Sequence, residues 1–350
     1  MKKRVITIFG ARPQFIKAAV LSREIQNYEN IEEILVHTGQ HFDKNMSDIF
    51  FEELELPKPK HFLDINSCSH GQMTGKMLSE IEGVLLQEKS DMVLVYGDTN
   101  STLAGALAAS KLHIPVVHVE AGLRSFNKKM PEEINRVLTD HLSSFLFCPT
   151  MQAVKNLGME GITVGVYHVG DIMYDATILA KDYIKKNPDK FNKSLMLDNV
   201  DFALMTIHRE ESTINQKNFS KFLCYANEFS KKNNVKILFI IHPRNRRFVK
   251  EYKENSNFYL MNPISYFETQ FLLSKASFVI TDSGGLQKEA YFHKVPCITL
   301  RSETEWVETI ENGWNRLWTD NNYNLQKTIK DYGDGFCAKK IIDILINNLK

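Results

Sequence analysis

Long apolar runs and an excess of charge of either sign are both missing from this chain of 350 residues. No stretch approaches the ~18 consecutive apolar residues of a membrane-spanning helix, so we expect no membrane segment. Lysine and arginine number 43 against 42 aspartates and glutamates, which leaves a net charge of +1. That balance argues against broad binding to nucleic acid or to a membrane surface, but it leaves room for a local basic pocket that binds a small anion.

Paired cysteines and metal-ligand spacings are also missing. The five cysteines are Cys68, Cys148, Cys224, Cys297 and Cys337, and no two of them form a Cys-x-x-Cys motif. Three of them lie in apolar strand or helix contexts, which predicts buried free thiols in a reducing cytoplasm. His37 and His41 are close in sequence, but they span a strand end and a loop, so we expect no metal there.

Short apolar, β-branched runs alternate with amphipathic segments from one end of the chain to the other. The predicted strands are residues 5–9, 34–37, 92–96, 116–119 and 145–148 in the first half, and 202–207, 236–241, 259–261, 278–281 and 297–300 in the second. The first of them follows a basic N-terminus, and its apolar run of about six residues is too short for a signal peptide. Runs that are apolar throughout suit a parallel sheet covered on both faces.

The length of the chain favours two domains, so the sequence predicts an α/β protein with two βα-repeat domains that face a cleft. The stretch 181–199 is rich in lysine, asparagine and aspartate and has no strand pattern. We therefore expect the junction between the domains just before it, around residues 166–174.

Carboxylates follow the strands of the first half. Asp98 comes directly after the strand at 92–96, Glu120 follows the strand at 116–119, and Glu132 opens a Pro-Glu-Glu segment. Because the carboxyl ends of parallel strands build the active site in such sheets, we expect the three carboxylates to act as acid/base groups at one edge. Each also has a structural alternative: Asp98 as a helix cap, Glu120 paired with Arg124, and Glu132 and Glu133 in the first turn of a helix.

A phosphate-bearing ligand is predicted at the turn after the first strand. Gly10 ends that strand, and Arg12 and Lys17 follow at the start of a helix, where they either meet a diphosphate or are solvated basic residues. The Gly-x-Gly-x-x-Gly fingerprint is missing from this turn, which argues against a nicotinamide cofactor.

A second phosphate site is predicted in the other half. Ser283 caps a helix that begins with Gly284 and Gly285, whose backbone N–H groups are able to approach an anion closely, and Glu289 lies near enough to reach ribose hydroxyls. A capped helix without a ligand is the alternative.

Histidines end two neighbouring strands of the second half. His208 and Arg209 offer a proton-transfer group and a fixed cation beside a leaving phosphate, and His242 closes the next strand. Packing or helix capping is the alternative for each histidine. A nucleotide-diphosphate site facing carboxylates suggests chemistry on an activated sugar. Both a glycosyltransferase and a 2-epimerase that eliminates the diphosphate and adds it back are compatible with these groups.

The motifs GARPQFIK, TGQH, VYGDTNST, HVEAGLRS, MPEEINR, HREES, HPRN, TDSGGLQKEA and YGDG resemble, in order and spacing, those of the non-hydrolysing UDP-N-acetylglucosamine 2-epimerase family. The resemblance implies a GT-B fold with two Rossmann-like, doubly wound parallel-sheet domains. Residues 1–170 would form the first domain and 171–333 the second, while a helix in 334–350 crosses back to the first. It also implies a cytoplasmic homodimer that acts on a UDP-sugar, with no cofactor, metal, nucleic acid or membrane partner.

Matching motif positions carry the family's functional residues onto this chain. Asp98, Glu120 and Glu132 resemble its acid/base carboxylates, and His208 its functional histidine. The positions that resemble its contacts to UDP and sugar are Arg12, Lys17, Arg136, Arg209, His242, Ser283, Gly284, Gly285 and Glu289.

Departures from the family pattern bear on regulation and substrate. Gln40 and His41 match positions that bind a second UDP-GlcNAc as activator in bacterial members, but Asp43 and Lys76 differ from the usual residues, which argues against such activation.

The opening GARPQFIKA, with Gln14 in place of the family's commonest glutamate, and the segment ETEWVE resemble the subgroup that epimerises UDP-2,3-diacetamido-2,3-dideoxy-glucuronate. The alternative substrate is UDP-GlcNAc. An acidic sugar needs a cation, and the candidates for it are Arg244, Arg246 and Arg247.

Overall fold

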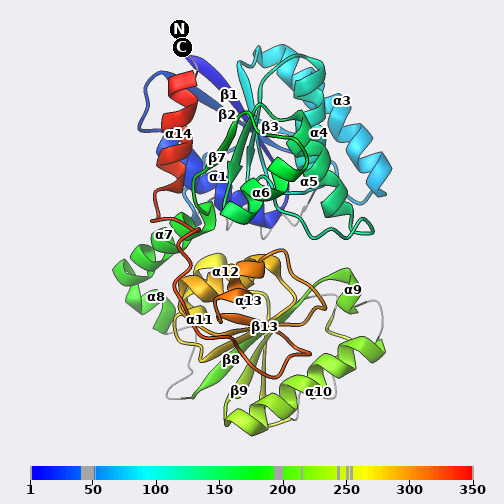
Figure 1. Ribbon diagram of the computed structural model, residues 1–350, viewed down its shortest axis with the longest axis vertical. Helices are drawn as coiled ribbons and strands as arrows, with labels where there is room; N and C mark the ends of the chain where they lie inside the picture. Colours follow the sequence, from blue (N-terminus) through cyan, green and yellow to red (C-terminus); the bar gives the residue numbers. More distant parts are fainter. Residues whose placement is uncertain are drawn as a thin grey trace. The chain divides into compact units, whose positions relative to one another are not determined.

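The computed structural model describes residues 2–40, 51, 53–192, 200–213, 216–242, 245–249, 252 and 255–348 (Figure 1). The chain divides into two compact units. Unit 1 combines residues 1–176 with residues 330–350, and unit 2 comprises residues 177–329. Each unit is built around its own parallel sheet.

In the described part of unit 1, seven parallel strands form a sheet in the order β3-β2-β1-β4-β5-β6-β7. Their bounds are β1 (Lys3–Phe9), β2 (Ile31–His37), β3 (His61–Phe62), β4 (Met92–Tyr96), β5 (Val116–Val119), β6 (Phe145–Cys148) and β7 (Val166–His168). The helices of unit 1 are α1 (Arg12–Ile25), α3 (His70–Glu88), α4 (Asn100–Lys111), α5 (Pro131–Leu142), α6 (Met151–Met159) and α14 (Cys337–Asn348), and α7 (Ile172–Lys186) runs from unit 1 into unit 2.

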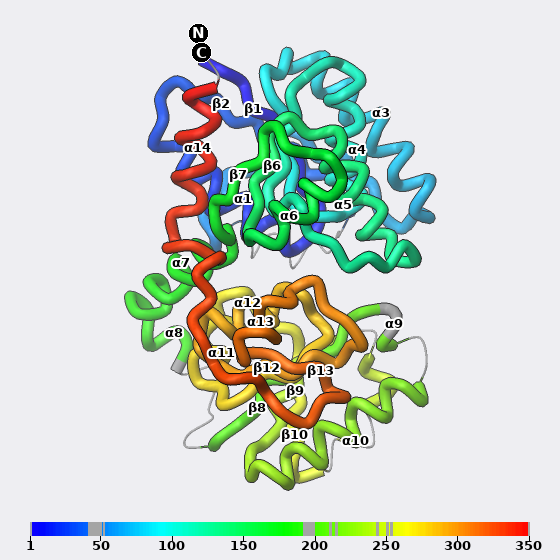
Figure 2. The backbone as a smooth tube through the Cα atoms, viewed as in Figure 1, coloured from blue at the N-terminus to red at the C-terminus, as the bar shows by residue number. Residues whose placement is uncertain are grey.

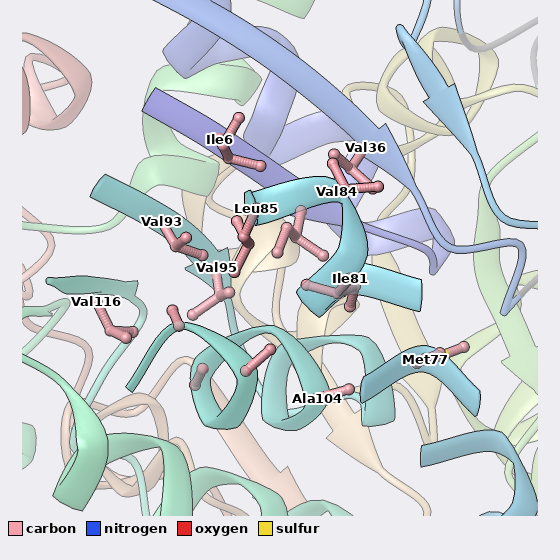
Figure 3. Close-up of a cluster of buried hydrophobic side chains, with 14 of the residues drawn as sticks. Ile6, Val36, Met77, Ile81, Val84, Leu85, Val93, Val95, Ala104 and Val116 are labelled. Atoms are coloured by element: carbon pink, nitrogen blue, oxygen red, sulfur yellow. The ribbon is translucent and has the colours of Figure 1, made fainter. Parts of the chain in front are cut away.

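One face of this sheet packs against α3 and α4. Figure 3 shows the buried cluster between them, which includes Ile6 and Val95 of the strands and Met77, Ile81 and other side chains of the two helices. The sequence of α4 is rich in alanine and has a glycine at Gly105, where an added Cβ would approach Ile8 Cδ1 to 2.9 Å. Small residues thus let α4 lie directly on β1 and β4, the two strands that lead into the predicted phosphate and acid segments.

Side chains alternate between the two faces of a strand, and those on the opposite face of this sheet pack against α1. Phe9 of β1 meets Phe15 of α1 with ring centroids 5.2 Å apart. The last helix, α14, packs on α1, and Figure 2 shows the end of the chain entering unit 1 to form it. Unit 1 is therefore completed by the two ends of the sequence.

Unit 2 has six parallel strands in the order β10-β9-β8-β11-β12-β13 in its described part. These are β8 (Phe202–Ile207), β9 (Lys236–Ile241), β10 (Phe258–Met261), β11 (Phe278–Thr281), β12 (Cys297–Thr299) and β13 (Asn315–Leu317). Its helices are α8 (Pro188–Asn192), α9 (Glu210–Thr213), α10 (Gln216–Asn233), α11 (Tyr266–Leu273), α12 (Gly284–Phe292) and α13 (Val307–Glu311). Two buried clusters, one including Phe219 and Leu223 of α10 and the other Leu272 of α11 and Leu286 of α12, cover both faces of the sheet.

The predicted α/β class with two parallel sheets is confirmed, and each of the predicted strands has a counterpart in the structure. Three strands were missed: β3, β7 and β13, which have only two or three residues each. Such short edge strands have too few residues to show an apolar pattern. One of them, β7, falls where the sequence predicted the junction between the domains.

Across the described residues, none of the helices combines the length and apolarity that a membrane crossing requires. Buried free thiols are confirmed at Cys148, Cys297 and Cys337, while Cys68 is half-buried and Cys224 exposed.

Candidate active site

Asp98 lies in the turn between β4 and α4. Gly97 before it has φ +61°, a backbone conformation that favours glycine, and Thr99 after it caps α4 by accepting a hydrogen bond from the Thr102 N–H. The structural alternative for Asp98, a helix cap, is therefore wrong. Instead its Oδ2 lies 2.5 Å from Nη2 of Arg136 on α5, whose guanidinium is buried.

Glu120 lies directly after β5, and its own backbone has φ +72°, uncommon outside glycine. Its Oε1 accepts a hydrogen bond of 2.7 Å from Nζ of Lys17 on α1, with only 12% of the glutamate side chain and 7% of the lysine side chain exposed. The alternative pairing with Arg124 is wrong, because that guanidinium binds Asp140 and Glu160. Lys17 thus contacts a carboxylate of its own unit.

Glu132 and Glu133 lie in the first turn of α5, as the sequence predicted. Glu133 is buried and accepts hydrogen bonds from the backbone N–H groups of Ser125 and Phe126 and from Nη1 of Arg136. Glu132 is exposed and lines a cavity. The two adjacent glutamates therefore differ in what they do: one holds the preceding loop, and the other is available to a ligand.

The cavity in unit 1 has a volume of about 170 Å³ and brings several predicted residues together. It is lined by Ala11, Pro13, Gln14, Lys17, Gln40, His70, Tyr96, Gly97, Asp98, Thr99, Asn100, Pro131, Glu132 and Asn135. Two of the three predicted acid/base carboxylates, Asp98 and Glu132, thus share one cavity with Lys17, the partner of the third.

Gln14 holds the two turns that border this cavity. Its Oε1 accepts the N–H groups of Gly10 and Ala11, and its Nε2 donates to the carbonyl of Tyr96 at 2.8 Å. An amide is able to donate and accept at the same time, whereas an ionised carboxylate only accepts. The glutamine at this position therefore ties the turn after β1 to the turn after β4.

Sequence reasoning missed His70, Asn100 and Asn135, which also line the cavity. Nδ2 of Asn135 donates to the backbone oxygen of Asp98 and to Oδ1 of Asn100, and Nδ2 of Asn100 lies 3.2 Å from Nδ1 of His70. Asn135 belongs to the motif MPEEINR, but nothing in the motif marks it as a site residue. His70 does not follow a predicted strand. For these three residues, no local pattern separates a side chain that lines the site from an ordinary surface polar side chain.

In unit 2, His208 and Arg209 lie after β8 and are fixed by Asp282, which follows β11. The buried carboxylate of Asp282 accepts the backbone N–H groups of both residues, and its Oδ1 lies 3.2 Å from Nδ1 of His208. Burial alone would raise the pKa of Asp282, but the hydrogen bonds from His208, Arg209 and Ser212 hold it below its ordinary value. Asp282 therefore stays ionised, and the His208 side chain remains 45% exposed.

The predicted phosphate turn of unit 2 begins α12. Ser283 caps the helix by accepting the N–H of Leu286, as the sequence predicted. An added Cβ at Gly284 would collide with Oε1 of Glu305, and the same oxygen lies 3.7 Å from Nη2 of Arg209. Arg209 and the start of α12 are thus neighbours.

The remaining predicted contacts lie at these turns or outside the described residues. Arg12 is the first residue of α1 and half-buried, and Glu289 is buried in α12, where it accepts a hydrogen bond from Gln270. Gln40 accepts hydrogen bonds from the N–H and hydroxyl of Ser101, and half-buried His242 follows β9. Three residues that were named from the sequence, His41, Asp43 and Arg244, lie outside the described residues.

Of the candidate cations for an acidic sugar, Arg246 and Arg247 are exposed. Arg246 donates to Asn262, and Arg247 stacks over the ring of Phe248. Within the described part of the chain, no group of three or more histidine, cysteine, aspartate or glutamate side chains is placed to hold a metal ion.

Comparison with known proteins points in one direction. A family model described as UDP-N-acetylglucosamine 2-epimerase matches residues 23–346. A Methanococcus maripaludis protein named UDP-N-acetylglucosamine 2-epimerase homolog is 48% identical over 361 residues, which cover 98% of this chain and 99% of the relative. A Pseudomonas aeruginosa protein named UDP-2,3-diacetamido-2,3-dideoxy-D-glucuronate 2-epimerase is 46% identical over 358 residues, again 98% and 99% of the two chains.

A solved structure agrees with these matches. The crystal structure of Methanocaldococcus jannaschii UDP-GlcNAc 2-epimerase in complex with UDP-GlcNAc and UDP superposes with a TM-score of 0.88 at 42% identity, and covers 99% of this chain and 100% of that one. The likeness thus extends over nearly the whole chain and confirms the predicted GT-B class with two Rossmann-like domains.

Proposed function

Because the chain belongs to the UDP-N-acetylglucosamine 2-epimerase family and is a UDP-sugar 2-epimerase, we propose that it inverts C2 of a UDP-2-acetamido sugar by eliminating UDP and adding it back. The preferred substrate is UDP-2,3-diacetamido-2,3-dideoxy-glucuronate, converted from the gluco to the manno form. The opening GARPQFIKA, the segment ETEWVE and the Pseudomonas aeruginosa relative of that name support this choice. UDP-GlcNAc is the second candidate, supported by the relatives and the solved structure that carry its name.

The proposed reaction needs one group to remove a proton and another to return one. A carboxylate takes the proton from C2 while the bond between C1 and the diphosphate oxygen breaks, its electron pair leaves with UDP, and a glycal with a C1–C2 double bond forms. A second acid then protonates C2 from the opposite face as UDP adds again to C1. At least two acid/base groups and cations for the departing diphosphate are required.

The single observation that carries the proposal is the carboxylate set of unit 1. Asp98 and Glu132 line the same cavity, and Lys17 in its wall holds Glu120. Two of these carboxylates are in ion pairs, Asp98 with Arg136 and Glu120 with Lys17, whereas Glu132 has no ion pair among the described residues. Such non-equivalent acids suit a reaction that treats the two faces of C2 differently.

In unit 2, the supporting groups for the diphosphate are the exposed His208, its neighbour Arg209 and the capped N-terminus of α12. The backbone N–H groups and the dipole at a helix N-terminus favour an anion. Imidazole and guanidinium groups stabilise the charge that develops on a departing phosphate oxygen.

Solvent deuterium tests both the reaction and the substrate. We expect that incubation with UDP-2,3-diacetamido-2,3-dideoxy-glucuronate in D2O places deuterium at C2 of both epimers, read by NMR, and that UDP-GlcNAc exchanges more slowly. A glycosyltransferase would leave C2 protonated and would react only when an acceptor is added. Failure of every UDP-2-acetamido sugar to exchange would overturn the proposal.

The setting of the enzyme is part of the same proposal. A role in surface polysaccharide synthesis, a cytoplasmic location and a homodimer follow from the family resemblance of the sequence. Analytical ultracentrifugation of the full chain checks the dimer, with a mass of twice 40.3 kDa expected.

A further inference from the structure

A fully buried histidine with acceptors on both sides lies behind the carboxylate cavity. His118 on β5 is 0% exposed. Its Nδ1 lies 2.7 Å from Oδ1 of Asp140, and its Nε2 lies 2.7 Å from the carbonyl oxygen of Gly97. A backbone carbonyl only accepts hydrogen bonds, so Nε2 must carry a proton.

The other neighbour, Asp140, also acts only as an acceptor. Its Oδ2 accepts the backbone N–H of Gly122 and Nη1 of Arg124, the latter at 2.7 Å. Burial opposes ionisation of this carboxyl, but His118 and Arg124 hold the pKa of Asp140 below its ordinary value. The two hydrogen bonds to Oδ2 thus hold Asp140 in place beside the His118 ring.

The carboxylate beside His118 is part of a buried network of charged groups. Arg124 forms hydrogen bonds of 2.7 Å with both oxygens of Glu160 and also binds Asp140. The charged groups of this cluster are therefore paired with one another. A buried charge is tolerated when it is paired and hydrogen-bonded in this way.

The His118 ring is connected to both turns that carry candidate acid/base groups. Gly97 directly precedes Asp98, and its N–H donates to the carbonyl of Val119, the residue before Glu120. His118 itself lies two residues before Glu120, and its partner Asp140 binds the turn after Glu120 through Gly122. The His118 ring is thus one of the contacts that hold the turn of Asp98 against the turn of Glu120.

We propose that His118 is a positioning residue, whose Nε2–H bond to Gly97 fixes Asp98 against Glu120 for the epimerisation. This inference rests on the proposed function of the two carboxylates. His118 is buried behind the turns and acts through them. Because misplacement of a catalytic group by about 1 Å can cost 10²-fold in rate, loss of this bond lowers kcat and leaves substrate binding largely intact.

Two conservative variants separate the two ring contacts. The amide nitrogen of glutamine replaces Nε2, so His118→Gln keeps a donor for Gly97, whereas asparagine replaces Nδ1, so His118→Asn keeps a donor for Asp140 only. We expect His118→Gln to retain kcat within ~10-fold and His118→Asn to lose ~10²-fold, both with KM within ~3-fold of the parent. His168→Asn, an exposed histidine of unit 1 that bonds the carbonyl of Asp331, is the matched control.

A merely structural histidine predicts a different pattern. The two variants would then lose kcat equally, in proportion to their loss of thermal stability, and that result would overturn the positioning role. A wild-type enzyme that exchanges no deuterium with any UDP-sugar would instead refute the proposed function, so the two failures are distinguishable.

A measurement on the wild-type protein tests the hydrogen bond between His118 and Gly97 without any substitution. In full-length protein labelled with 15N-histidine, Nε2 of His118, assigned through its backbone, is expected to show the shift of a protonated ring nitrogen, because it faces the carbonyl oxygen of Gly97. A spectrum with an unprotonated Nε2 would contradict the proposal.

Discussion

The three candidate acid/base residues occupy different settings, and each setting gives a substitution a defined meaning. We expect Asp98→Asn, Glu120→Gln and Glu132→Gln each to cut turnover by ~10²-fold or more while UDP still binds, because each keeps the shape of the side chain and removes its acid/base function. Turnover by NMR and UDP binding by calorimetry check this.

Glu80→Gln is the control for these three variants, since Glu80 is an exposed residue of α3 in the same unit. Near-normal turnover in all three variants would refute the assignment.

Asp282 shows how a buried carboxylate supports an exposed histidine. In Asp282→Asn, an amide N–H replaces one of two oxygens that each accept a backbone N–H, so at least one hydrogen bond is lost and the turn loosens. We expect turnover to fall by ~10-fold or more and the free energy of unfolding to fall by about 1–3 kcal/mol. Steady-state kinetics and urea unfolding measure both quantities.

Asp201→Asn, an exposed aspartate before β8, should change neither quantity. An Asp282→Asn variant as active as the parent would show that the turn does not need this carboxylate.

Part of the site was open to prediction from local pattern, and part was not. Asp98 and Glu120 were located because each follows an apolar strand, and Ser283 because a serine before two glycines is a typical helix cap. The partner of Glu120 could not be predicted from local pattern, since Lys17 is 103 residues away in sequence. Nearness in sequence favoured Arg124 instead, and the fold pairs that residue with Glu160 on another helix end.

On β2, Glu33 places a carboxyl group against β1. Its Oε1 accepts a 2.5 Å hydrogen bond from the hydroxyl of Thr7, and burial raises its pKa from 4.5 to about 7. A raised carboxyl pKa means that the folded chain keeps a proton that the unfolded chain has lost. Stability is therefore reduced progressively as the pH rises from about 4.5 through 7, by at most about 3 kcal/mol.

A neutral side chain at this position should remove the penalty. We expect Glu33→Gln to resemble the parent near pH 4.5 and to exceed its free energy of unfolding increasingly up to pH 8, measured by urea unfolding at several pH values. Glu29→Gln, an exposed glutamate just before the same strand, should give a difference that does not vary with pH. A flat difference for Glu33→Gln as well would contradict a titration of this residue.

The strands were predictable where they contain an apolar run. Each predicted strand contains an apolar run, so its position follows from the sequence, whereas β3, β7 and β13 are edge strands of two or three residues. The start of α5 at Pro131 was also predictable, since proline favours the first turn of a helix.

At the scale of the molecule, the last helix belongs to the first unit. Ile341 and Leu345 of α14 are buried, and the helix packs on α1. Ile341→Ala should therefore lower the free energy of unfolding of unit 1 by about 2–5 kcal/mol.

The three tryptophans, Trp306, Trp314 and Trp318, all lie in unit 2, so their fluorescence reports on that unit alone. We expect Ile341→Ala to shift the transition seen by circular dichroism to lower urea while the fluorescence midpoint stays in place. Asn347→Ala, at an exposed position of the same helix, should shift neither. Equal shifts of both signals in Ile341→Ala would show that the two units unfold as one.

Because unit 1 is made from both ends of the chain, the order of synthesis and the order of folding differ. All of unit 2 has been made once residue 329 is added, whereas the first strands of unit 1, made earliest, still lack α14. At a synthesis rate of about 5–20 residues per second, the face of α1 that α14 covers stays exposed for many seconds before α14 is made. The first half of this protein is therefore the part most exposed to chaperones, and the second half is the first able to finish folding.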